Sequence, residues 1–118
     1  MAKVLVVDDS AFMRMRCVSL LGELGHEAVE AADGQQALDL YPRARPDAVL
    51  LDITMPGLDG LTVLREIISL DPGAKVAMVT AMGQQGMVAE ALASGAKDFI
   101  IKPFEMDRVK EALEKLVA

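Results

Sequence analysis

Short runs of apolar residues alternate along the chain with stretches whose apolar residues recur at helical spacing. The first run, Val4-Leu5-Val6-Val7, is apolar on both faces, which favours a strand buried within a parallel sheet. Apolar residues then recur at helical spacing from Met13 to Leu24, with Ser10 as a candidate N-cap and Gly25 as a stop. The chain therefore begins with a predicted strand followed by a predicted helix.

The rest of the chain repeats this alternation. Strands are predicted over residues 27–31, 47–51, 75–79 and 97–101, and helices over residues 34–41, 61–68, 84–93 and 106–117. Turn-forming residues end three of these helices: Pro42, the segment Asp71-Pro72-Gly73, and Gly95. Five strands alternating with five helices predict an α/β fold, a doubly wound parallel sheet of the flavodoxin-like type with helices on both faces.

Polar residues stand directly after four of the five predicted strands: Asp8 and Asp9, Asp52, Thr80, and Lys102. The carboxyl ends of parallel strands share one edge of a sheet, and open α/β sheets bind ligands there, where the strand order reverses. With the order 2-1-3-4-5, the reversal lies between the first and third strands. This order brings Asp8 and Asp9 beside Asp52 and places Thr80 and Lys102 on the other side.

These residue types suit phosphoryl chemistry. Packed carboxylates repel one another, and a divalent cation such as magnesium, which prefers oxygen ligands, relieves that repulsion. A carboxylate can also be a nucleophile that forms an aspartyl phosphate, a reaction that mostly needs positioning and charge neutralisation. Lys102 offers a positive charge and Thr80 a hydroxyl for that group. Singly, such residues are more often helix caps or solvated side chains, so it is their convergence that favours a site.

The amino-acid composition indicates which classes of binding partner and which cellular compartment to expect. The net charge of −6 argues against direct binding of nucleic acid, which needs a basic face. Cys17 is the only cysteine, so no internal disulfide forms, and we expect a buried, inert thiol. No apolar run reaches the roughly 20 residues of a membrane span, so we expect a cytoplasmic protein with no membrane partner. We expect residues 1–118 to form one domain, with no output domain.

Several segments resemble the motifs of response-regulator receiver domains, in order and at the family's spacing: VLVVDDS at 4–10, LLDITMPG at 50–57, VTA at 79–81 and IKPF at 101–104. The segments AMGQQ at 81–85 and GAKDFI at 95–100 further resemble stand-alone chemotaxis regulators of the CheY type. The resemblance covers essentially the whole chain. The strand order 2-1-3-4-5 is already known for flavodoxin-like proteins, CheY among them, so it is not independent evidence of the family.

The resemblance implies a role for each residue of the predicted site. Asp52 is the expected phosphoacceptor, and Thr80 and Lys102 are expected to contact the phosphoryl group. Mg²⁺, for which Mn²⁺ can substitute, is expected on Asp9, Asp52 and the backbone carbonyl of Thr54, with Asp8 acting mainly through a bound water. The resemblance also implies switch roles for Thr80 and Phe99 and a cis peptide bond between Lys102 and Pro103.

The resemblance further implies a two-component signalling protein that is an enzyme only towards itself, in its own phosphorylation and dephosphorylation. The expected donor is a sensor histidine kinase, and the expected target is the flagellar motor switch in chemotaxis or another protein. A dedicated phosphatase is a further expected partner. Added charge on Asp52 shifts a pre-existing equilibrium between two conformations, read out on the fourth helix, fifth strand and fifth helix.

Residues outside the motifs carry lesser expectations. In the family that the chain resembles, the side chains two residues after the phosphoacceptor and two residues after the Thr80 position influence the attacking water. These positions are Thr54 and Met82 here, and the apolar side chain of Met82 cannot orient water. We therefore expect a longer-lived acyl phosphate than in relatives with a polar residue there. His26 is expected on the surface, not as a phosphoacceptor. The methionines are expected to be mostly core or groove filler: Met13, Met15, Met78, Met82, Met87 and Met106.

The sequence leaves other functions open. Within the family, the chain can be a phosphorelay intermediate or the receiver of a DNA-binding regulator. A magnesium-dependent phosphatase of the haloacid dehalogenase type also uses an aspartyl phosphate, but its nucleophile follows the first strand in an Asp-x-Asp pattern, whereas here Asp8 and Asp9 are adjacent. A flavin- or nucleotide-binding protein is disfavoured because acidic residues replace a glycine-rich phosphate loop after the first strand.

Overall fold

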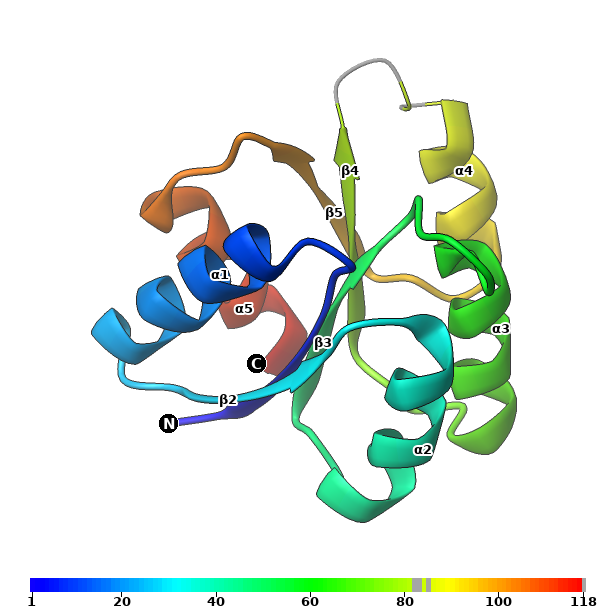
Figure 1. The fold of residues 1–118 in the computed structure, drawn as a ribbon, viewed down its shortest axis with the longest axis horizontal. Coiled ribbons are helices and arrows are strands. Elements are labelled where there is room, and N and C mark those ends of the chain that lie inside the picture. Colours follow the sequence, from blue (N-terminus) through cyan, green and yellow to red (C-terminus); the bar gives the residue numbers. More distant parts are fainter. Residues whose placement is uncertain (82–83, 85, 118) are drawn as a thin grey trace.

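The structure is a computed structural model that describes residues 1–81, 84 and 86–117. The sheet has five parallel strands in the order β2-β1-β3-β4-β5, so the predicted order is confirmed (Figure 1). The strands are β1 (Lys3–Val7), β2 (Glu27–Ala31), β3 (Ala48–Asp52), β4 (Val76–Ala81) and β5 (Asp98–Lys102). Each described strand lies within one residue or two of its predicted range.

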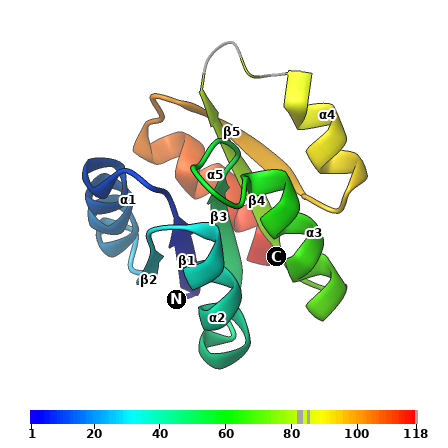
Figure 2. The same cartoon turned by 45° about the vertical axis from the view of Figure 1, so that its right-hand side comes forward.

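Helices cover both faces of the sheet. They are α1 (Ala11–Glu23), α2 (Gly34–Ala44), α3 (Gly60–Leu70), α4 (Gly86–Ala93) and α5 (Met106–Val117). Helices α1 and α5 lie on one face, and α2, α3 and α4 lie on the other (Figures 1 and 2). Because helices cover both faces of the sheet, side chains on both faces of a central strand are buried. This explains why the central strands are apolar on both faces.

The alternation of side chains along β1 divides the core in two. Leu5 and Val7 belong to a cluster packed under α2, α3 and α4, whereas Val4 and Val6 belong to a second cluster under α1 and α5. All four are at most 2% exposed. Burying each such side chain contributes roughly 1.5–3 kcal/mol relative to leaving it in water. This packing holds the carboxyl ends of the central strands in fixed positions.

Short polar side chains cap the helices that follow three of the strands. Ser10 Oγ accepts from Met13 N, as predicted, and begins α1 directly after the Asp8-Asp9 pair. Asp33 and Asp59 cap α2 and α3 in the same way, each accepting a backbone N–H three residues on. Because such a cap satisfies an otherwise unpaired donor of the first helical turn, it fixes where each helix starts after its strand.

The prediction that Pro42 ends the second helix is wrong. Helix α2 continues through Pro42 to Ala44 and ends at Arg45, which has a left-handed backbone with φ of 47°. Proline removes one backbone N–H but leaves the carbonyl of Tyr41 free to accept from Arg45 N at 3.0 Å. The buried Tyr41 also donates its hydroxyl to Asp71 at 2.8 Å, which anchors this last turn against the segment after α3.

Among the predictions for single residues outside the motifs, some are confirmed and others are not. Cys17 is buried, as predicted, and burial raises the pKa of its thiol to about 11. The surface position predicted for His26 is confirmed only in part, because His26 is partly exposed and its Nδ1 accepts from Ala2 N at 3.0 Å. The prediction that Met15 fills the core is also wrong, because Met15 is 60% exposed. Met78, in contrast, is fully buried. Met82 lies outside the described residues.

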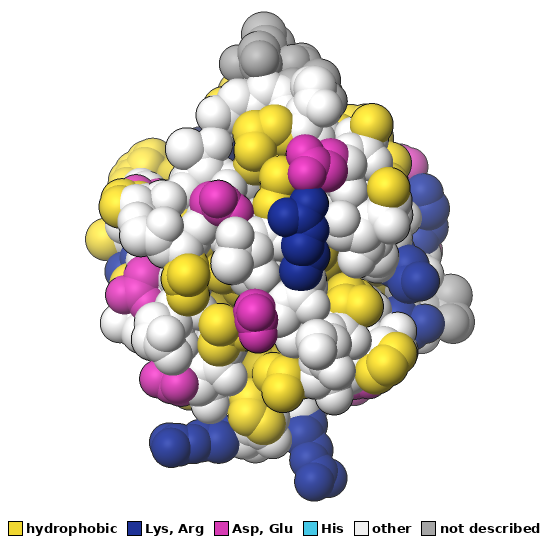
Figure 3. Space-filling view, turned by 90° about the vertical axis from the view of Figure 1, so that its right-hand side faces the viewer, with side chains coloured by type: hydrophobic (Ala, Val, Ile, Leu, Met, Phe, Trp, Pro, Cys, Tyr) yellow, Lys and Arg dark blue, Asp and Glu magenta, His cyan; other side chains and the backbone are white. Residues whose placement is uncertain are grey.

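None of the described helices is both long enough and apolar enough to cross a membrane. On the face formed by α3 and α4, acidic and basic side chains are interspersed with hydrophobic ones (Figure 3). An exposed ion pair joins these two helices, with Arg65 Nη2 at 2.6 Å from Glu90 Oε1. This face therefore lacks the continuous basic surface that phosphate backbones require.

Candidate functional site

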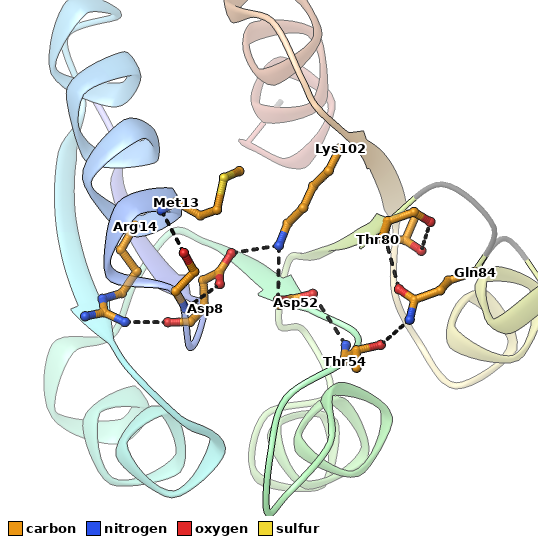
Figure 4. Close-up of polar contacts among 10 residues, drawn as sticks. Asp8, Met13, Arg14, Asp52, Thr54, Thr80, Gln84 and Lys102 are labelled. Carbon is orange, nitrogen blue, oxygen red and sulfur yellow. Dashed lines mark hydrogen bonds and ion pairs between the residues drawn. The ribbon is translucent and has the colours of Figure 1, made fainter.

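The carboxyl ends of β1, β3 and β5 bring three charged side chains into contact. Lys102 Nζ lies 3.0 Å from Asp8 Oδ2 and 3.2 Å from Asp52 Oδ2, so one ammonium group bridges two carboxylates (Figure 4). The residues come from positions up to 94 apart in the chain. The side chains of Asp8 and Asp52 are only 6% and 7% exposed, and that of Lys102 is 20% exposed. The sequence prediction that these residues meet is confirmed.

Burial and pairing act in opposite directions on the charges of this cluster. Burial raises the pKa of Asp52, as does the neighbouring charge of Asp8, while Lys102 holds it down; the net direction is upward. Burial alone would lower the pKa of Lys102, but its contacts with Asp8 and Asp52 outweigh burial and raise it. Lys102 is therefore a firmly held cation, and Asp52 is a carboxylate at which further positive charge is favourable.

Asp8, Asp9 and Asp52 form the one group of metal-ligating side chains found among the described residues. One ligand atom from each lies within 4.8 Å of the other two. Asp9 is exposed, while Asp8 and Asp52 are buried, so the group opens towards solvent on one side. Carboxylate oxygens on a partly open surface fit a hard divalent cation that keeps some of its waters. The donor set is therefore suitable for magnesium.

The loop that carries Asp8 and Asp9 is held by contacts that the sequence pattern did not reveal. Asp8 Oδ1 accepts from Ser10 N at 2.9 Å, which closes a tight turn after β1. Arg14, one turn into α1, donates from Nη1 to the backbone carbonyl of Asp8 at 2.6 Å and pairs with Glu30 at 3.4 Å. Arginine recurs on many helices, so only the fold identifies Arg14 as a support for this loop.

Gly60 has no side chain, which allows the start of α3 to pack closely against the backbone at Asp52. A Cβ atom placed on Gly60 would lie 2.1 Å from the backbone oxygen of Asp52 and 2.6 Å from Ile53 Cα. Gly60 N donates to Ile53 O at 2.8 Å, so the start of α3 is bonded directly to the strand end. Only glycine fits this approach, because any other residue would add a Cβ atom at this position.

Thr54, two residues after Asp52, and Thr80, on the neighbouring strand β4, lie in different environments. Thr80 is fully buried, and its hydroxyl donates to the carbonyl of Ala81 at 3.2 Å. Thr54 is exposed; its N–H donates to Asp52 Oδ1 over 3.4 Å, and its hydroxyl accepts from Gln84 Nε2 at 2.7 Å. The contact to Gln84 was not predicted, because nothing in the sequence pairs residues from these two loops.

Phe99 and Lys102 lie on β5, the first near its start and the second at its end. Phe99 is half-buried and packs against the core cluster under α2, α3 and α4. The peptide bond between Lys102 and Pro103 is cis, as the resemblance implied. Asp98, at the start of β5, pairs with Arg108 of α5 at 3.1 Å, and Arg108 also donates to the carbonyl of Phe99.

Comparison with known proteins agrees with this geometry. A family model described as the response regulator receiver domain matches residues 4–114. The chain belongs to this family. It is 53% identical over 116 residues to the chemotaxis protein CheY of Listeria monocytogenes, covering 98% of both chains. It is thus a two-component receiver domain with relatives named CheY, and the expected family is confirmed.

Solved structures give the same result. The CheX–CheY–BeF3–Mg²⁺ complex of Borrelia burgdorferi contains a chain with a TM-score of 0.92 and 36% identity, covering 98% of this chain and 89% of that one. NtrX of Brucella abortus, in complex with ADP, matches with a TM-score of 0.94 and 37% identity. The match covers 98% of this chain but 27% of NtrX, so the same module also occurs inside a longer protein.

Proposed function

We propose that this receiver accepts a phosphoryl group on Asp52 from a phosphohistidine of a sensor kinase. The observation that carries the proposal is the bridging of Asp8 and Asp52 by Lys102 Nζ at 3.0 and 3.2 Å, inside a cluster of three carboxylates. A structural ion pair needs one carboxylate for one ammonium group. A third acidic side chain, Asp9, adds uncompensated negative charge at a sheet edge where ligands bind.

In the proposed transfer, a carboxylate oxygen of Asp52 attacks the phosphorus atom of the phosphohistidine. A phosphorus–oxygen bond forms, the phosphorus–nitrogen bond breaks, and the imidazole leaves with the electron pair of that bond. Lys102 is already 3.2 Å from Asp52 Oδ2 and offers its ammonium protons to the phosphoryl oxygens. The N–H of Thr54 points at the other Asp52 oxygen and offers a further donor.

Magnesium fits the proposed site and, when bound, neutralises charge on the phosphoryl oxygens. Asp9, Asp52 and the backbone carbonyl of Thr54 are the proposed ligands, with Asp8 acting through a water molecule. Asp8 is already engaged by Ser10 N and Lys102, so both of its oxygens accept hydrogen bonds within the protein. This agrees with an indirect role for Asp8, and Mn²⁺ is expected to substitute for Mg²⁺ because it takes similar oxygen ligands.

The proposed switch begins at Thr80. Its buried hydroxyl donates to Ala81 O, and a phosphoryl group on Asp52 offers stronger, charged acceptors. Turning the Thr80 hydroxyl towards Asp52 breaks its hydrogen bond to the Ala81 carbonyl and shifts the end of β4. Phe99, half-buried on the neighbouring strand, then turns inward and changes the surface of α4, β5 and α5. Phosphorylation thereby shifts an existing equilibrium.

We further propose that this surface binds a protein of the flagellar motor switch in the cytoplasm. The support is the likeness to a CheY over nearly the whole of both chains. In the Borrelia structure a CheY is bound to CheX, which supports a further protein as an additional partner. We propose that a dedicated phosphatase is such a partner. Apart from its own phosphorylation and dephosphorylation, we propose no enzymatic activity. A second candidate, the receiver of a longer regulator, is favoured by the match to part of NtrX.

Binding of a phosphoryl mimic tests this function. Beryllium fluoride attached to Asp52 should give a protein-bound ¹⁹F NMR signal in the presence of Mg²⁺ and none without it. The Asp9→Asn variant should need more Mg²⁺ for the same signal, whereas Asp33→Asn, which keeps a capping side chain outside the cluster, should match the wild type. A missing signal at saturating Mg²⁺, or a signal independent of Mg²⁺, would contradict the proposal.

A further inference from the structure

The side chain of Gln84 joins the two loops that border Asp52. Its Nε2 donates to Thr54 Oγ1 at 2.7 Å, and its Oε1 accepts from Ala81 N at 3.3 Å (Figure 4). Gln84 N also donates to Ala81 O at 3.1 Å, the same carbonyl that accepts from Thr80. One side chain therefore connects the loop after β3 to the end of β4.

This bridge lies on the solvent side of Asp52. Asp52 is 5% exposed and Thr80 is fully buried, whereas Thr54 is exposed and Gln84 is half-buried. Water that attacks a phosphoryl group on Asp52 arrives from solvent, in line with the bond from phosphorus to the Asp52 oxygen. Thr54 N lies 3.4 Å from Asp52 Oδ1, so Thr54 is an exposed hydroxyl residue next to the carboxylate that such water must approach.

Resting on the proposed function, we propose that Gln84 is a positioning residue that slows hydrolysis of the phosphoryl group by holding the Thr54 hydroxyl. The amide of Gln84 occupies an acceptor lone pair of Thr54 Oγ1 and fixes the direction of that side chain. A hydroxyl held in this way is less able to accept a hydrogen bond from an attacking water and orient it towards phosphorus. Gln84 therefore lengthens the life of the signal without touching the phosphoryl group.

Hydrolysis of the phosphoryl group on Asp52 needs water as its only co-reactant. The water oxygen forms a bond to phosphorus while the bond from phosphorus to the Asp52 oxygen breaks. The carboxylate of Asp52 is regenerated, and inorganic phosphate leaves with both protons of the water before it titrates in solvent. Gln84 does not donate or accept a proton in this step; it determines whether Thr54 can assist it.

A double-mutant cycle on phosphoryl lifetime tests the inference. Wild type, Gln84→Ala, Thr54→Ala and the double variant are phosphorylated with acetyl phosphate and Mg²⁺, freed of donor, and followed by intact mass. We expect Gln84→Ala to lose the phosphoryl group about fivefold faster than wild type. We expect no acceleration by Gln84→Ala when Thr54 is already alanine. Gln35→Ala, which removes an exposed glutamine amide from α2, serves as the control and should match wild type.

The outcomes separate this inference from the proposed function. If the wild type takes up no phosphoryl group, the proposed function fails, and this inference fails with it. If all variants are phosphorylated but Gln84→Ala decays at the wild-type rate or slower, the inference alone is overturned. Equal acceleration with and without the Thr54 hydroxyl also overturns it, because the effect then comes from loosening of the loop. Thermal midpoints of the four proteins show whether any variant is merely less folded.

Discussion

The ammonium group of Lys102 offsets two buried carboxylates at once. Without it, Asp8 and Asp52 would repel each other in a poorly solvated environment, which would raise the pKa of Asp52 further. With it, the Asp8–Lys102–Asp52 trio carries one net negative charge, and Asp9 adds another at the rim. The site therefore attracts cations, and the contact with Lys102 favours the ionised form of Asp52 that the proposed phosphoryl transfer requires.

The backbone of Gly60 packs directly against the backbone of Asp52. In Gly60→Ala, the new methyl group would overlap the Asp52 carbonyl, so the strand end or α3 must move. We expect a loss of about 1–3 kcal/mol in unfolding free energy, the usual cost of overpacking, and slower phosphorylation. Chemical denaturation measures the first effect, and uptake of phosphoryl groups from acetyl phosphate measures the second.

Gly22→Ala is the matched control for this prediction. Gly22 lies near the end of α1, and beyond its own helix backbone and chain neighbours no heavy atom would lie within 4 Å of an added Cβ. Alanine should therefore stabilise the helix by roughly 0.5–1 kcal/mol. Phosphorylation should be unaffected. Equal stability of Gly60→Ala and wild type would show that the strand end is not held by this close packing.

At the scale of single residues, the site residues that could be predicted from the sequence are those that directly follow a predicted strand. Asp8, Asp52 and Lys102 follow apolar runs, and the parallel sheet alone brings them together. Arg14 and Gln84 could not be predicted in the same way. Their partners are a backbone carbonyl and a hydroxyl on another loop, and such contacts depend on three-dimensional placement that leaves no periodic pattern.

Between elements, β5 and α5 are tied by a buried carboxylate. Asp98 accepts from Phe99 N at 2.8 Å and from Arg108 Nη2 at 3.1 Å, and Lys115 lies 3.7 Å away. Burial favours the neutral form of Asp98, but the contacts with Arg108 and Phe99 N outweigh it and lower the pKa. This tie fixes α5 beside the strand that carries both Phe99 and Lys102.

The lowered pKa of Asp98 predicts a pH-dependent contribution to stability. Because the folded pKa lies below the unfolded one, the contribution is complete above the ordinary aspartate pKa of about 3.9 and is lost as pH falls through the folded pKa. Asp98→Asn should therefore cost about 1–3 kcal/mol at pH 7 and progressively less below about pH 4. Denaturation curves across that range measure the difference from wild type.

Asp39→Asn provides the comparison, since Asp39 is an exposed carboxylate on α2. Its stability should follow the wild-type curve at every pH within a few tenths of a kcal/mol. A difference between wild type and Asp98→Asn that stayed constant down to pH 3 would rule out a charge effect and leave only a packing effect.

Most helices and strands could be predicted, because the spacing of apolar residues and the turn-forming residues act over a few neighbouring positions. Val4 to Val7 and the cap at Ser10 give β1 and the start of α1 without reference to the rest of the fold. The end of α2 was not predictable. There, burial of Tyr41 and its bond to Asp71 outweigh the local preference of Pro42 to end a helix, and Asp71 is thirty residues away in sequence.

For the whole molecule, the two-sided core sets where chemistry is possible. Helices cover both faces of the sheet, so polar side chains from the central strands can meet only at its ends (Figures 1 and 2). The end that carries Asp8, Asp52 and Lys102 also carries the loops through which Thr54 and Gln84 touch. We propose that a charge added there acts on Thr80 of β4 and Lys102 of β5 together, and that a small group can in this way change a distant surface.

The central claim is that Asp52 carries the signal, and intact mass after incubation with acetyl phosphate and Mg²⁺ tests it most directly. Wild type should gain the mass of one phosphoryl group. Asp52→Asn should gain none, and Asp33→Asn should gain as much as wild type because its side chain only caps α2. No gain in wild type, or an equal gain in Asp52→Asn, would contradict the claim and remove Asp52 as the acceptor.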